Sequence, residues 1–133
     1  MIRRRKPLRK TGIRRRPKTA RQKLIDEADA VWREKALRRD SYQCRRCGST
    51  WAVLAVHHVV TRAKHSVRWV LANGLTLCTG CHFWVHNHLL ASRAVGFYAS
   101  LGADLEAMEM QSQQSWKHQD IKLIIIGLKM GVS

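Results

Sequence analysis

Acidic residues are scarce in this sequence: nine Asp and Glu stand against 25 Lys and Arg, which gives a formal net charge of +16. That excess is larger than solubility requires and indicates a polyanionic partner, most simply nucleic acid; an anionic membrane surface is the competing interpretation. The chain also lacks any apolar run approaching the ~20 residues of a membrane-spanning helix, so we expect no membrane partner. The basic N-terminus is followed neither by an apolar run nor by a small-residue cleavage site, so we expect that it is not a secretory signal.

Cysteine is also sparse, with four residues in 133. We expect a cytoplasmic protein, and in that compartment thiols bind metals more often than they form disulfides. The four cysteines form two Cys-x-x-Cys pairs, Cys44/Cys47 and Cys78/Cys81. Two such knuckles predict one tetrahedral structural Zn²⁺ site, and Gly48 permits a positive φ after the first. Buried free thiols and redox-active pairs are the alternatives.

The N-terminal 24 residues contain twelve Lys or Arg and no Asp or Glu. Pro7 and Pro17 interrupt any helix there, and too few apolar residues are present to offset the cost of ordering. We predict a disordered basic arm over residues 1–24 that binds phosphates by counterion release. A solubilising tail is the alternative. The arginines expected to bind nucleic acid are Arg3, Arg4, Arg5, Arg14, Arg15 and Arg16.

A chain of this length predicts one domain, which we place at residues 25–133. Apolar residues at helical spacing predict a helix from about Ala20 to Arg39, with Trp32 in the core. Val- and Leu-rich residues 52–60 predict a strand. Asn73-Gly74 is typical of a hairpin turn, and residues 75–77 would form the return strand.

The strand at residues 52–60 carries His57 and His58, and a helix from about Cys81 to Leu90 carries His82 and His86. Adjacent strand residues point to opposite faces, so both strand histidines can serve one site only where the strand ends or bends. Four residues turn a helix by about 400°, so His82 and His86 share a face, whereas His88 points elsewhere. Phe83 and Val85 of this helix are expected in the core.

The run V-H-H-V, then Asn73, then C-T-G-C-H-F-W-V-H resembles the HNH endonucleases. The resemblance covers about residues 38–88. Within this segment the sequence is similar to bacteriophage HNH proteins, and loosely to the NinG-type recombination nucleases of phages. It implies an α+β fold: a small ββα-metal (His-Me finger) core at about residues 52–90, with the Cys₄ knuckle pair, flanking helices and the basic arm. It further implies a bacterial host cytoplasm and, as partners, DNA, including branched or nicked DNA, and other phage DNA-processing or packaging proteins.

The resemblance also implies roles for single residues. His57, His82 and His86 would bind one catalytic divalent metal, either Mg²⁺, Mn²⁺, Ni²⁺ or Zn²⁺. His58 would be the general base that deprotonates water, and Asn73 would hold the loop and orient that base. Hydrolysis would leave 5′-phosphate and 3′-hydroxyl ends. A neutral imidazole suits both metal binding and general-base work near neutral pH. In the loop after the strand, Arg62, Lys64 and Arg68 are expected to bind nucleic acid.

Two other functions remain open. A zinc-ribbon nucleic-acid adaptor would explain the four cysteines and the arm but does not need the four histidines together. An RNA-binding protein of ribosomal type would explain only the charge. The apolar run at residues 121–130 predicts a terminal strand or helix packed on the core, with a partner or dimer surface as the minor alternative. The oligomeric state is expected to be a monomer or a weak dimer.

Overall fold

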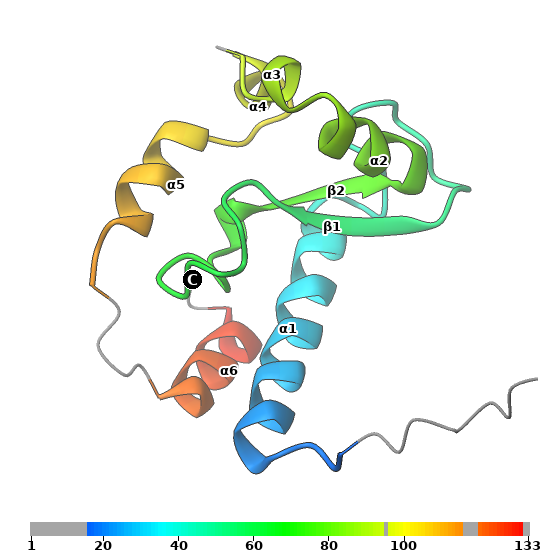
Figure 1. Ribbon diagram of the computed structural model, residues 1–133. Helices are drawn as coiled ribbons and strands as arrows, with labels where there is room; N and C mark the ends of the chain where they lie inside the picture. The colour runs from blue at the N-terminus through cyan, green and yellow to red at the C-terminus, as the bar shows by residue number, and fades with distance from the viewer. Residues whose placement is uncertain (1–15, 95, 116–119, 132–133) are drawn as a thin grey trace, which may run out of the picture.

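The structure is a computed structural model that describes residues 16–94, 96–115 and 120–131 (Figure 1). It is a small α+β fold in which helices surround a two-stranded sheet. In chain order the elements are α1 (Ala20–Arg39), β1 (Leu54–His58), η1 (Leu71–Asn73), β2 (Gly74–Cys78), α2 (Thr79–Asn87), α3 (Leu89–Ser92), α4 (Phe97–Ser100), α5 (Leu105–Ser112) and α6 (Ile121–Met130).

Helix α1 has the predicted bounds. Its N-terminus is fixed by Thr19, whose hydroxyl accepts a hydrogen bond from the backbone N–H of Gln22. Trp32 is buried, as predicted, and its indole N–H donates to the carbonyl oxygen of Val70. The predicted arm therefore has to be shortened, because residues 20–24 belong to this helix. Residues 1–15 of the arm lie outside the described residues.

Strands β1 and β2 pair in an antiparallel register that sets His57 opposite Leu75 and His58 opposite Gly74. Helix α1 lies against one face of this sheet and α2 against the other (Figure 1). On the face that contacts α1, position 74 has to be glycine, because a Cβ there would lie 2.7 Å from the Trp32 ring. The two helices therefore bring different side chains to the two faces of β1.

The connection between the strands corrects the predicted hairpin. Asn73 ends the η1 turn and Gly74 begins β2 with an extended φ of −102°, so this dipeptide forms no tight two-residue turn. The strands are joined instead by a loop of residues 59–73, which includes η1. Strand β1 is also shorter than the predicted 52–60, because the chain leaves the sheet for this loop after His58.

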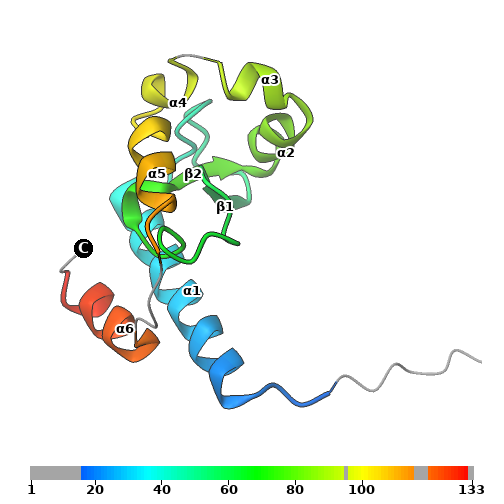
Figure 2. The ribbon, with the colours of Figure 1, turned by 60° about the vertical axis from the view of Figure 1, so that its left-hand side comes forward.

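The C-terminal part of the chain is helical throughout most of its described length. Two short helices, α3 and α4, follow α2, and Gly102 comes after α4 with a φ of 77°. Helix α6 packs along α1, as both ribbon views show (Figure 2), so the apolar run is a helix on the core. None of the helices in the described ranges is both long and apolar enough to span a membrane.

Candidate metal centres

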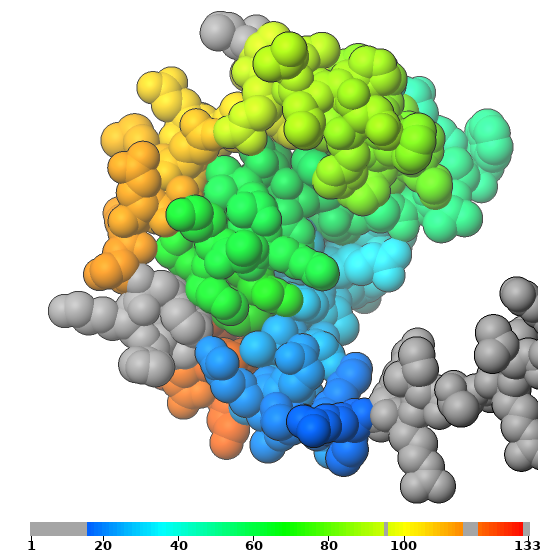
Figure 3. Space-filling model, viewed as in Figure 1, coloured from blue at the N-terminus to red at the C-terminus, as the bar shows by residue number. Residues whose placement is uncertain are grey.

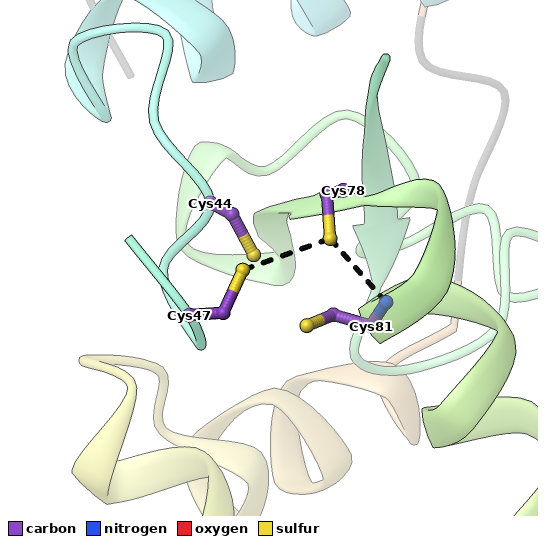
Figure 4. A group of neighbouring side chains, drawn as sticks. All are labelled: Cys44, Cys47, Cys78 and Cys81. Atoms are coloured by element: carbon purple, nitrogen blue, oxygen red, sulfur yellow. Dashed lines mark hydrogen bonds between the residues drawn. The ribbon is translucent and has the colours of Figure 1, made fainter. Parts of the chain in front are cut away.

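Four cysteines meet beside the sheet, and they come from three elements. Cys44 and Cys47 lie on the loop after α1, Cys78 ends β2, and Cys81 lies in the first turn of α2 (Figure 4). Their sulfur atoms all lie within 4.8 Å of one another. Two thiolates on a tetrahedral Zn²⁺, each at ~2.3 Å, are about 3.8 Å apart. The Sγ atoms of Cys47 and Cys78 are 3.7 Å apart, so the group fits a structural metal such as zinc.

The surroundings of Cys44 favour a thiolate, whereas burial raises the pKa of Cys81 to about 12, so that thiol loses its proton on binding a metal. Burial alone would raise the pKa of Cys44, but backbone hydrogen bonds from Cys47, Cys78 and Arg46 outweigh it and lower the pKa to about 7. The Arg46 guanidinium lies 3.6 Å from the Sγ of Cys81 and 4.0 Å above the Trp84 ring. This cation adds positive charge beside a group of sulfurs that is negative when a metal is bound.

Three histidines form a second group, and two of them lie on α2, as Cys81 does. His57 comes from β1, and His82 and His86 come from one face of α2; one ring nitrogen of each lies within 4.8 Å of the others. The Nε2 atoms of His82 and His86 are 3.2 Å apart. Two imidazole nitrogens on a tetrahedral ion at ~2.0–2.1 Å are about 3.3 Å apart, so the spacing fits a shared divalent cation.

The three-histidine group differs from the cysteine group in what it can do chemically. Three protein ligands leave coordination positions for water or substrate, as catalytic sites require, whereas four thiolates close a site. Burial, and then the nearby His82 and His86, lower the pKa of His57 to about 3, so it is neutral and able to ligate at pH 7. The Tyr98 hydroxyl lies 3.2 Å from the Nε2 of His57, which fixes the orientation of the ring.

His58 lies on the other face of β1, in contact with α1. Its ring stacks on Trp32 at a centroid distance of 4.2 Å, and its Nε2 lies 3.0 Å from the carbonyl oxygen of Arg68. A carbonyl only accepts, so Nε2 carries the proton and Nδ1 keeps its lone pair in the neutral ring. Burial lowers the pKa of His58, although the Arg68 carbonyl opposes this shift. His58 still lines the same cavity of about 530 Å³ as His57, His82 and His86, because β1 ends there.

Asn73 is fully buried and braces the loop that follows His58. Its Oδ1 accepts from the N–H of Val60 at 2.7 Å, and its Nδ2 donates to the carbonyl oxygens of Val60 and Val67 at 2.9 and 3.0 Å. Its own carbonyl oxygen accepts from the N–H of Val59. The loop is therefore held to the sheet immediately after the two strand histidines.

The basic residues predicted to bind nucleic acid have different surroundings. Arg62 and Lys64 are exposed on the loop, and Arg16 is exposed before α1. Arg68 forms a two-pronged ion pair with Asp29, whose carboxylate also accepts from the Trp69 indole; this guanidinium therefore ties the loop to α1. The other arm arginines, Arg3, Arg4, Arg5, Arg14 and Arg15, lie outside the described residues.

Sequence reasoning missed three residues at this site: Trp32 as the stacking partner of His58, Tyr98 beside His57, and Arg93 on the cavity wall. Trp32 and Tyr98 reach the site from distant segments, and periodicity predicts only that such residues are buried.

The prediction that Phe83 belongs to the core was wrong, since it is 70% exposed, whereas Val85 is buried as predicted. His88 lies outside the three-histidine group and stacks on Trp84.

Comparisons of the chain with models of protein families, with curated proteins and with solved structures found no match.

Proposed function

We propose that this chain is a metal-dependent endonuclease of the HNH type that hydrolyses DNA phosphodiester bonds. One observation carries the proposal: His57, His82 and His86 converge on a single cavity that His58 also lines. This combination supplies an open metal-ligand set and, beside it, an imidazole that is not one of the ligands. In this proposal β1, β2 and α2 form a ββα-metal core, and the cysteine group holds zinc that fixes the end of β2 to the start of α2.

His58 is suited to the part of general base. Its unprotonated Nδ1 can accept a proton from water, because Nε2 donates its own proton to the Arg68 carbonyl. The lowered pKa keeps the ring neutral at pH 7, which a base requires. Stacking on Trp32 holds the ring plane. Asn73 keeps this geometry by bracing the loop that directly follows.

The three-histidine group is suited to a divalent cation, either Mg²⁺, Mn²⁺, Ni²⁺ or Zn²⁺. When bound, such a cation polarises a phosphoryl oxygen and neutralises charge on the leaving 3′-oxygen. His57 is held for this by the Tyr98 hydroxyl, and His82 and His86 are held by the single turn of α2 that separates them. The products expected from the HNH resemblance carry 5′-phosphate and 3′-hydroxyl ends.

Replacing His58 with alanine tests the proposal most directly. The base acts in the transition state and only weakly in the bound ground state. We therefore expect His58→Ala to lower the cleavage rate about 10²–10⁴-fold with little change in DNA affinity. His82→Ala should abolish cleavage by weakening metal binding, and a higher metal concentration should partly restore it. The assay is cleavage of plasmid and of four-way junctions with a panel of divalent metals.

His88→Ala is the matched control, because His88 follows α2 closely but lies outside the three-histidine group. It should cleave at close to the wild-type rate. The nuclease assignment would be overturned if the wild-type protein binds DNA but cuts no substrate with any divalent metal, and if His58→Ala matches it in every measurement. That result would leave a zinc-dependent DNA-binding adaptor as the function.

A further inference from the structure

Arg93 is fixed to the helix that carries two of the site histidines. It follows α3 directly, and the preceding residue, Ser92, is fully buried. The Ser92 hydroxyl lies 3.3 Å from the carbonyl oxygen of Val85, which sits between His82 and His86 on α2. The backbone at Arg93 therefore keeps a constant position relative to the three-histidine group.

Arg93 also stands where two cavities meet. The cavity of about 530 Å³ that holds the four histidines is lined by Thr61, Arg62 and Arg93 as well. A neighbouring cavity of about 390 Å³ is lined by Thr61, Lys64, Arg93 and Glu109. Thr61 and Arg93 belong to both walls, so the two cavities are adjacent, and we call them together the trough. In the space-filling view, α2 and α3 (yellow-green) and α5 (orange) border the green segment around β1, so these elements reach one face (Figure 3).

The charges along this trough are three cations and one anion. Arg62, Lys64 and Arg93 contribute the positive charges, and Glu109 of α5 forms an ion pair with Arg93. The side chains of this pair are 53% and 43% exposed. Arg68 is different, since its side chain is only 13% exposed in its pair with Asp29. Exposed ion pairs contribute little to stability, so another anion can displace the Glu109 carboxylate from Arg93.

We infer that Arg93 binds a backbone phosphate of the DNA strand whose scissile phosphate lies at the histidines, and that Glu109 competes with that phosphate for it. The inference rests on the proposed function, which supplies the phosphodiester ligand. A guanidinium binds two phosphate oxygens at once, so the exchange of carboxylate for phosphate replaces the one hydrogen bond of the Arg93–Glu109 pair with two. Glu109 thereby lowers DNA affinity until a strand occupies the trough.

Binding of duplex DNA to the full chain, measured by fluorescence anisotropy without added divalent metal, tests the inference separately from cleavage. Glu109→Gln should bind several-fold more tightly than wild type. Arg93→Gln should bind more weakly, and its log–log salt slope should be shallower by about 0.9, the value for one lost phosphate contact. The ratio of wild-type to variant affinity should then shrink about 3.5-fold between about 50 and about 200 mM salt.

The pair formed by Glu27 and Lys129 provides matched controls, because it is similarly exposed, at 48% and 56%, and joins α1 to α6 away from the trough. Glu27→Gln and Lys129→Gln change the net charge by the same amounts and should alter affinity much less. Arg93→Lys keeps the charge and should retain most of the affinity, which separates charge from damage to the fold. The inference would be overturned if the trough variants and their controls change DNA affinity equally, even if His58→Ala slows cleavage. In a protein that never cuts DNA, the same trough effects would support phosphate binding by Arg93 and would overturn its placement beside a scissile phosphate.

Discussion

His57 and His58 are adjacent in the sequence but have opposite surroundings. The alternation of β1 turns His57 toward α2 and its two histidines, and turns His58 toward Trp32 on α1. His57 is 7% exposed, and burial is the largest cause of its low pKa. One position along the strand thus separates a candidate metal ligand from a candidate base.

The pKa of His57 predicts how stability changes with pH. The ordinary pKa of 6.5 applies to the unfolded chain, and the folded value is about 3. Below pH 6.5 the unfolded state binds a proton at His57 that the folded state does not bind. The contribution of His57 to the free energy of unfolding is therefore fully present above pH 6.5 and is lost as the pH falls toward 3. Between pH 7 and 5 we expect His57 to lower the free energy of unfolding by about 2 kcal/mol. Urea unfolding at both pH values, without added divalent metal, measures it.

The variant His57→Gln is the control for this loss, because glutamine does not titrate while the cysteines and the other histidines remain. Its free energy of unfolding should fall about 2 kcal/mol less than that of wild type between pH 7 and 5. The same fall in both proteins would mean that His57 accepts its proton in the folded state.

The elements that sequence predicts best here are those set by local signals. Helix α1 begins after the Thr19 cap and carries its apolar residues at helical spacing, so its bounds were predictable. The two knuckles were predictable because the Cys-x-x-Cys spacing is itself the geometry of the site. The Asn73-Gly74 prediction failed because the Asn73 side chain is used in three loop hydrogen bonds, which no local pattern encodes.

Longer-range packing explains the remaining differences. Tyr98 and Arg93 reach the histidines because α3 and α4 fold back on α2, and the sequence near them has no metal-site pattern. Phe83 was expected in the core, but its side chain is exposed on α2. The sequence pattern predicted which residue types form the candidate site. Which residues line its cavity depends on tertiary contacts, which the pattern does not encode.

The cysteine group joins the loop after α1, the end of β2 and the start of α2. Cys78 ends β2 and also accepts from the backbone N–H of Cys81, so it connects the sheet to α2. Structural zinc contributes on the order of 10 kcal/mol to the folding of small domains. Total stabilities are about 5–15 kcal/mol. We therefore expect Cys78→Ser to lose its zinc and most of its folded population at room temperature, measured by elemental analysis and circular dichroism.

Thr79→Ala is the neighbouring control. It removes a methyl group and the hydroxyl that donates to the Val53 carbonyl oxygen, a hydrogen bond worth about 0.5–1.5 kcal/mol, and it should keep its zinc. Wild-type protein purified without chelators that contains no zinc, together with a folded Cys78→Ser variant, would contradict a structural role for the cysteines.

At the scale of the whole molecule, the described residues form three buried groups that hold the fold together. One surrounds the cysteines and β2, the second joins α1 to α6, and the third is small and lies under the loop and α5. Ile121, Ile125 and Leu128 of α6 are buried against α1, whereas Leu123 and Ile126 of the same apolar run are exposed. The surplus of positive charge plays no part in these groups and is available for binding.

Deleting residues 1–16 tests the contribution of the arm. The deletion removes nine Lys and Arg but keeps Lys18, which pairs with Asp26, and the Thr19 cap of α1. The melting temperature should therefore change little. DNA affinity should fall, and the log–log salt slope should become shallower by about 0.9 for each phosphate contact that is lost. A full-length variant with glutamine at the same nine positions separates charge from chain length and should behave like the deletion. If both proteins keep the wild-type salt slope, the arm contacts no phosphates and serves only solubility; the trough around Arg62, Lys64 and Arg93 would then have to supply the electrostatic part of binding alone.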